Sequence, residues 1–192
     1  MLLQTHEIDT INEILSKAQG DNRTVLFEHE VYDMLDCIGL QTPKYIFVEN
    51  ESEVNNELIS QFAGKMVVKI VSRDLAHKQK YGGVKMLETS ESLYVRYVMS
   101  GMINEIYSHF SDGEKPTIDG FVIVEFVSFK QGLGYELMFG AREDAAFGPV
   151  LTLSKGGDDA EFFAKYYDPA NLYLSPLSAR VAGRHQTLLK YR

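Results

Sequence analysis

Residues 67–87, VVKIVSRDLAHKQKYGGVKML, constrain the fold most, because two short apolar runs flank a polar loop and a glycine pair. Each run has the length and composition of a β-strand. Lys69 interrupts the first run, and a lysine in a buried strand is costly unless its ammonium group meets an anion or water. Two interpretations stay open: Lys69 faces solvent from a half-exposed strand, or it meets an anion that binds there.

Helical and strand-like segments alternate along the rest of the chain, which predicts the α+β class. A turn-rich link, SDGEKPTIDG, suggests a boundary between two lobes. We expect an N-terminal helical extension at 1–21, a first lobe at 22–115 and a second lobe at 116–192. Helices are expected over 9–19, 28–40, 52–64 and 90–111, and strands over 42–50, 65–71, 82–88, 121–127, 135–144 and 148–154.

Composition excludes several classes of protein. The net charge of −8 disfavours a nucleic-acid binder, which usually has a basic surface. The single cysteine, Cys37, allows no intramolecular disulfide, and no run of 18 apolar residues suggests a membrane span. We therefore expect a cytoplasmic protein that binds neither nucleic acid nor membrane.

The loop in the opening segment carries His77 and Lys78 and ends in Gly82 and Gly83. A loop histidine is most often a solvated surface residue, but it can also bind a metal, act as a base or accept a phosphoryl group. A zinc site is disfavoured, because the other histidines and the cysteine show no ligand spacing with it. The glycine pair is either a flexible turn or a place where backbone N–H groups approach phosphate.

Two further segments hold candidate residues. In LSKGGDD, Gly156 and Gly157 follow a predicted strand and precede several acids, among them Glu161. Such glycines and carboxylates fit either a turn or a site for phosphate and Mg²⁺. Glu125 interrupts the apolar run VIVEFV, so it either lies in water at a sheet edge or contacts an adenine or ribose group.

The order of these motifs resembles the ATP-grasp domain of the nucleoside-diphosphate-forming acyl-CoA synthetases. The matching segments are VVKIVSRDLAHKQKYGGV, GYELMFGAREDAAFGPV and KGGDDAE, within about residues 24–178. The resemblance implies an ATP-grasp fold, in which two α+β lobes hold ATP/ADP and Mg²⁺ between them. It also implies that His77 is the catalytic residue, as the carrier of phosphate between a phosphohistidine on a partner domain and ADP.

The resemblance assigns the other candidates to the nucleotide. Lys69 would contact the phosphates, and the strand that ends at Val127 would hold adenine with Glu125 at its polar position. The expected nucleotide-binding residues are Lys69, Lys78, Gly82, Gly83, Glu125 and Val127. The expected phosphate or metal residues are Glu161, Gly156 and Gly157, with Glu161 as the metal ligand.

Two departures from the family pattern bear on activity. Tyr173, in NLYLSPL, stands where the family has an arginine, and the family's C-terminal metal-binding strand has no counterpart, so we expect a truncated, incomplete second lobe. A CoA-binding and ligase partner is expected to be needed for turnover, and the chain alone is not expected to be fully active. The alternatives are a non-catalytic binding or regulatory homologue, or another ATP-grasp ligase such as a succinyl-CoA-synthetase-like subunit.

Overall fold

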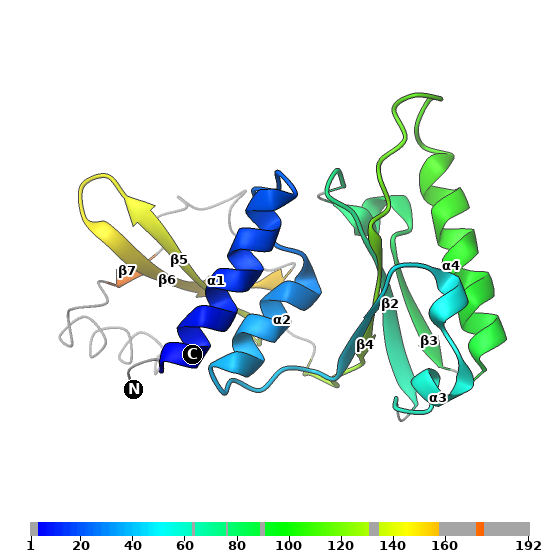
Figure 1. Ribbon diagram of the computed structural model, residues 1–192, viewed down its shortest axis with the longest axis horizontal. Helices are drawn as coiled ribbons and strands as arrows, with labels where there is room; N and C mark the ends of the chain where they lie inside the picture. Colours follow the sequence, from blue (N-terminus) through cyan, green and yellow to red (C-terminus); the bar gives the residue numbers. More distant parts are fainter. Residues whose placement is uncertain are drawn as a thin grey trace. The chain divides into compact units, whose positions relative to one another are not determined.

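The computed structural model describes residues 4–62, 64–75, 77–88, 91–130, 135–157 and 172–174 (Figure 1). The chain forms two compact units, Met1–Val127 and Ser128–Arg192. This division falls later than the lobe boundary expected after residue 115. The physical reason is strand pairing, since β4 (Gly120–Glu125) hydrogen-bonds to strands of the first unit.

The first unit contains a four-stranded sheet with the order β1-β4-β2-β3, in which all neighbouring strands are antiparallel. Lys69, in β2, lies opposite Val122 of β4 and Val84 of β3. The remaining elements of this unit are α1 (Thr5–Gly20), α2 (Glu28–Cys37), β1 (Tyr45–Val48), η1 (Glu51–Glu53), α3 (Asn56–Ile59), β2 (Lys65–Val71), η2 (Lys78–Tyr81), β3 (Val84–Glu88) and α4 (Ser92–Tyr107).

The two faces of the sheet bury different sets of side chains. Met66, Val68 and Ile70 of β2 are fully buried in a core shared with α4, which covers this face in Figure 1. Side chains alternate along a strand, so Lys69 and Val71 point to the opposite face. There Val71 packs in a smaller core with Val122 and Val124 and with aromatic residues that include Phe27 and Tyr32.

The start of α2 is fixed by a buried ion pair. The Arg23 guanidinium donates two hydrogen bonds of 2.7 Å to the Glu30 carboxylate, and the two side chains are 3% and 5% exposed. Glu30 also accepts a hydrogen bond from the backbone N–H of Phe27 at 2.8 Å, and Arg23 lies over the Phe27 ring. Bidentate pairs of this kind are geometrically specific. They hold Glu28, the first residue of α2, in a defined place.

In the second unit, β5 (Leu137–Asp144), β6 (Gly148–Lys155) and β7 (Leu172–Leu174) form an antiparallel sheet in that order. The turn between β5 and β6 is closed by Asp144, whose side chain accepts hydrogen bonds from the backbone N–H groups of Ala146 and Phe147. Gly148 completes the turn with a φ of 69°, which favours glycine. The expected α+β class is confirmed. Within the described residues, no helix is both long and apolar enough to span a membrane.

Candidate functional site

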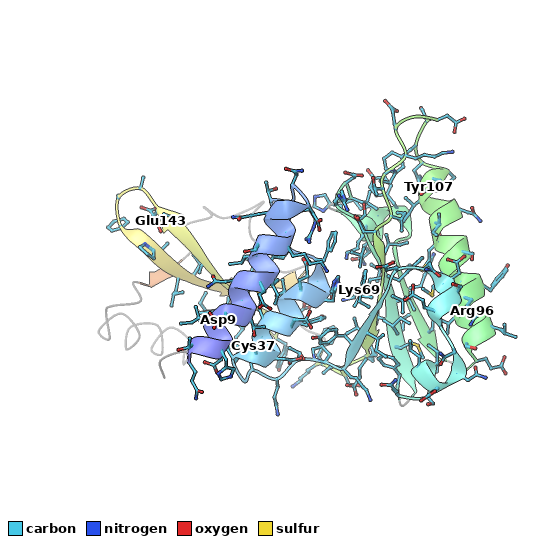
Figure 2. All side chains as sticks on the ribbon, viewed as in Figure 1. Asp9, Cys37, Lys69, Arg96, Tyr107 and Glu143 are labelled. Carbon is cyan, nitrogen blue, oxygen red and sulfur yellow. The ribbon has the colours of Figure 1, made fainter. Side chains whose placement is uncertain are left out.

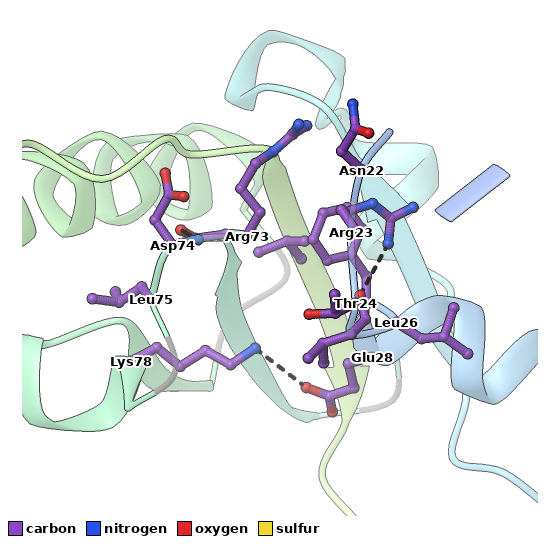
Figure 3. A pocket seen from close by; sticks show the side chains of 13 residues that line it. Asn22, Arg23, Thr24, Leu26, Glu28, Arg73, Asp74, Leu75 and Lys78 are labelled. Atoms are coloured by element: carbon purple, nitrogen blue, oxygen red, sulfur yellow. Dashed lines mark hydrogen bonds and ion pairs between the residues drawn. The ribbon is translucent and has the colours of Figure 1, made fainter. Parts of the chain in front are cut away.

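Two lysines from different segments meet one carboxylate on the α2 side of the first sheet. Lys69 Nζ lies 2.5 Å from Glu28 Oε1, and Lys78 Nζ lies 3.7 Å from Glu28 Oε2. Lys69 comes from the middle of β2 and Lys78 from the first turn of η2 (Figures 2 and 3). The three side chains are 23–27% exposed, so the cluster is neither sealed in the core nor free in water.

Glu28 is ionised in this environment. Burial alone would raise the pKa of its carboxyl group, but hydrogen bonds from Lys69 and Tyr32 and the charge of Lys78 outweigh burial and hold that pKa below its usual range. The Tyr32 hydroxyl, one helical turn further along α2, donates to Glu28 Oε1 at 2.7 Å. Burial raises the pKa of the Tyr32 hydroxyl, and the hydrogen bond to Glu28 raises it further.

Lys78 is held at the end of β2 by the backbone. Its ammonium group donates to the carbonyl oxygen of Ile70 at 3.1 Å. Burial lowers the pKa of Lys78; the charge of Glu28 opposes this shift and that of Lys69 adds to it. The cluster thus holds two ammonium groups against one carboxylate.

This donor set fits a phosphate group. An ammonium group has three N–H donors. In the described part of the chain, Lys69 uses one donor on Glu28, while Lys78 uses one on Ile70 and pairs with Glu28 by charge. Each lysine therefore keeps a donor for an oxygen of an incoming anion, and their combined charge exceeds that of the single carboxylate.

A pocket of about 470 Å³ adjoins the cluster, with Glu28 and Lys78 in its wall (Figure 3). Its other lining residues are 22–27 and 71–75. The loop after β2 is held in place by Arg73, which pairs with Asp119, and by Asp74, which accepts a hydrogen bond from the backbone N–H of Thr117 at 2.8 Å. The pocket therefore lies between two anchored segments.

His77 lies immediately before η2 and is exposed to solvent. Gly82 ends η2 with a φ of 78°, and the N–H of Gly83 donates to the carbonyl oxygen of Lys78 at 2.8 Å. A Cβ on Gly83 would lie 2.9 Å from that same oxygen, so only glycine fits without a shift of the backbone. The N–H of Gly82 likewise donates within the loop, to Gln79. In this structure the pair closes the loop; a contact between these glycines and the nucleotide stays a prediction.

The two residues predicted to contact adenine, Glu125 and Val127, lie at the C-terminal end of β4 and just beyond it. Glu125 is the last residue of β4, lies opposite Met66 and is exposed. Its carboxylate accepts a hydrogen bond of 3.3 Å from the backbone N–H of Lys44. Val127 lies two residues further along the chain and is 55% exposed.

The predicted phosphate and metal residues belong to the second unit. Gly156 donates its N–H to the carbonyl oxygen of Glu136 at 2.9 Å, and Gly157 has a φ of 60°. Glu161 lies outside the described residues, so its predicted role as a metal ligand stays a prediction. No group of three or more His, Cys, Asp or Glu side chains that would hold a metal ion occurs in the part of the chain that the structure describes.

Glu28 is the site residue that sequence reasoning missed. It stands in FEHE at the start of a helix, where acidic residues are common because they interact with the helix dipole. That signal does not distinguish a helix-terminal acid from a functional one. Only the folded structure brings Glu28 to two lysines more than 40 positions further along the chain.

Comparison with known proteins shows the family to which the chain belongs. The model of an ATP-grasp domain family matches residues 17–187. The chain therefore belongs to the ATP-grasp family, as the sequence motifs predicted.

The relatives that match are ADP-forming CoA ligases. The 4-hydroxybutyrate–CoA ligase [ADP-forming] of Nitrosopumilus maritimus is 30% identical over 76% of this chain, which spans 20% of that ligase. The beta subunit of acetate–CoA ligase [ADP-forming] I of Pyrococcus furiosus is 30% identical over 76% of this chain and 58% of the subunit. The chain thus spans between a fifth and three fifths of these relatives.

A solved structure agrees with this assignment. The dinucleotide-forming acetyl-coenzyme A synthetase 1 of Ca. Korarchaeum cryptofilum, in complex with coenzyme A, Ca-AMPCP and HgCl+, matches with a TM-score of 0.70 and 26% identity over 90% of this chain and 69% of that chain. A second complex of that enzyme, with coenzyme A and Mg-AMPPCP, has its phosphohistidine segment pointing towards the nucleotide binding site and matches with a TM-score of 0.63 at 25% identity. The expected ATP-grasp fold is confirmed.

Proposed function

We propose that this chain is the nucleotide-binding, phosphoryl-transfer module of an ADP-forming acyl-CoA synthetase. The observation that carries the proposal is the meeting of two ammonium groups, of Lys69 in β2 and of Lys78 in η2, next to a pocket and to His77. Phosphoryl transfer depends mainly on positioning and on neutralisation of charge, which two adjacent lysines provide. The ADP-forming relatives support the same reaction class.

In this proposal Lys69 and Lys78 bind the phosphates of ADP or ATP, and His77 carries the phosphoryl group. An imidazole nitrogen of His77 attacks the phosphorus of a phosphohistidine on a partner domain, so that one P–N bond forms while the other breaks. A terminal phosphate oxygen of ADP then attacks the same phosphorus, which releases the His77 imidazole and yields ATP. Solvent exposure of His77 is compatible with access from both partners.

The remaining predicted residues are assigned to the ends of the nucleotide. Glu125 and Val127 are proposed to contact adenine or ribose, and Gly156, Gly157 and Glu161 to lie at the phosphate and metal end. Mg²⁺, when bound, neutralises charge on the phosphates. The calcium and magnesium nucleotide complexes of the structural relative support the need for a divalent ion.

The full reaction would convert acyl-CoA, ADP and phosphate into acid, CoA and ATP. We propose that it requires a CoA-binding and ligase domain or subunit as partner, because this chain spans only part of each related ligase. The acetyl-CoA synthetase relative binds coenzyme A, which supports a partner of that kind.

Transfer of phosphate through His77 is tested with the partner domain present. Wild type and His77→Ala are incubated with labelled phosphohistidine donor and Mg-ADP, and labelled ATP is measured. The proposal expects label on the wild-type chain and in ATP, and loss of both in the variant. Equal ATP yields from the two proteins would remove His77 from the mechanism.

A non-catalytic nucleotide-binding module is the second candidate, favoured by Tyr173. This residue lies in β7 opposite Thr152, where the family pattern predicts an arginine. A tyrosine carries no positive charge, so it does not neutralise the negative charge on the phosphoryl group during transfer. Nucleotide binding without label transfer in the same experiment would favour this second function.

A further inference from the structure

We propose that Glu28 is a positioning residue, whose carboxylate fastens the loop carrying His77 to β2 by joining Lys69 and Lys78. This inference rests on the proposed function, because it assigns those lysines to phosphate. The geometry behind it is the placement of one carboxylate between two ammonium groups, with one oxygen facing each.

Glu28 is itself held by the fixed start of α2 and by Tyr32. It is the first residue of α2, whose start is fixed by the buried Arg23–Glu30 pair. Tyr32 donates to the same oxygen that faces Lys69, and its ring packs with the apolar cluster of Val71 and neighbours. A carboxylate fixed in this way serves as an anchor for other groups.

The anchor reaches His77 through its neighbour in the chain. Lys78 follows His77 directly and begins η2. Its side chain turns back to Glu28 (Figure 3), and its ammonium group donates to the carbonyl oxygen of Ile70. The loop has its own bonds, from the Lys80 N–H to the His77 carbonyl oxygen at 3.0 Å and from the Gly83 N–H to Lys78. These bonds shape the loop internally, while the side chain of Lys78 ties it to β2 and α2.

Glu28 can anchor the lysines without displacing the phosphate. Each ammonium group keeps a donor after its contacts within the described residues, as shown above. Glu28 therefore orients the remaining N–H groups of Lys69 and Lys78. A bound phosphate requires donors that are oriented in this way before it binds.

The test compares wild type with Glu28→Gln, which keeps the size and the acceptor oxygen but removes the charge. Glu88→Gln is the matched control, because Glu88 is an exposed residue of β3 that pairs at 3.8 Å with Lys65 of β2, the strand that also carries Lys69. Two quantities are measured: the affinity for Mg-ADP by calorimetry, and amide hydrogen exchange in residues 77–83. Exchange in α4 reports any change in global stability.

We expect Glu28→Gln to weaken Mg-ADP binding about three- to tenfold, since charged hydrogen bonds are roughly twice as strong as neutral ones. Amide exchange in 77–83 should rise while exchange in α4 stays unchanged, and Glu88→Gln should match wild type in both. Unchanged or tighter binding with an unchanged loop would overturn the inference and leave the proposed function standing.

No Mg-ADP binding by wild type would instead overturn the proposed function, and this inference with it. If Glu28→Gln does not fold, the same two measurements are made on Tyr32→Phe. This variant removes only the hydroxyl that holds the Glu28 carboxylate. We then expect the same two changes at smaller size, and their absence would overturn the inference.

Discussion

Lys69 and Glu28 form an ion pair although 41 positions separate them in the chain. The contact joins the middle of a sheet strand to the first turn of a helix on the sheet's second face. It explains how a lysine is tolerated within the apolar run of β2: its charge is met by a fixed carboxylate, and its remaining N–H donors are left for other acceptors. Of the two interpretations left open for Lys69, the structure shows a half-buried lysine that meets an anionic group of the protein.

Stability should depend on pH through Glu28. Folding lowers the pKa of this carboxyl group from a usual value of 4.5, so its ionised form stabilises the folded state above that pH. The contribution is lost as the pH falls through the lowered folded value. We expect Glu28→Gln to be about 1–2 kcal/mol less stable than wild type at pH 7, and this difference to shrink progressively as the pH falls below 4.5.

Urea unfolding of both proteins at pH 7, 5, 4 and 3 measures this difference. Glu88→Gln serves as control, because its carboxylate is 72% exposed and exposed pairs contribute below about 1 kcal/mol. A difference between wild type and Glu28→Gln that stays constant from pH 7 to pH 3 would contradict the account.

The central strand was predictable because its sequence leaves few alternatives. The run KMVVKIV gave the bounds 65–71, and β2 has the same bounds. A short run rich in valine and isoleucine, bounded by glycine and polar residues, favours an extended conformation. The hairpin of β5 and β6 was also expected, since a glycine-containing turn separates two strand-like segments.

The buried face of α4 does not follow from its sequence spacing. Helical spacing suggests one buried face with Leu93, Tyr97, Met102 and Ile106, but Leu93 and Tyr97 are each 76% exposed. The buried face instead runs through Val95 and Met99. Because apolar residues occur all round this helix, its sequence periodicity does not define one face, and contact with the sheet decides it.

The partner of β4 could not be read from local sequence either. The strand-like segments 121–127, 135–144 and 148–154 are joined by short turns with glycine, which suggests one antiparallel run. In the structure β4 pairs with β1 and β2, while β5 starts the second sheet. Pairing between distant strands depends on the fit of whole faces, which single segments do not encode. The same limitation hid Glu28, whose role arises only from contacts across the fold.

The titration of Lys78 should respond to Glu28. Burial lowers the pKa of this lysine and the charge of Glu28 raises it, so removing that charge should lower the pKa further. We expect NMR of ¹³C-methylated lysines to show that the titration midpoint of Lys78 lies at a lower pH in Glu28→Gln than in wild type. Identical midpoints would mean that the 3.7 Å pair does not exist in solution.

Substitution by alanine should change the stability of the protein in opposite directions at Gly83 and Gly101. Gly83→Ala would place a Cβ 2.9 Å from the Lys78 carbonyl oxygen, so we expect it to destabilise the protein by about 1–3 kcal/mol. Gly101, within α4, has nothing within 4 Å of its Cβ position, so Gly101→Ala should stabilise it by about 0.5–1 kcal/mol. Thermal or urea unfolding measures both changes, and equal effects of the two substitutions would contradict the loop geometry.

Calorimetry of Mg-ADP binding to wild type, Lys69→Met and Lys65→Met tests the central claim most directly. Lys65 lies on the same strand but is half exposed and outside the cluster, so it is the matched control. A lost charged hydrogen bond costs about 1.5–3 kcal/mol, which corresponds to about tenfold to a hundredfold in affinity. The account predicts that loss for Lys69→Met and wild-type affinity for Lys65→Met. Equal affinities in all three proteins, or no binding by wild type, would contradict it.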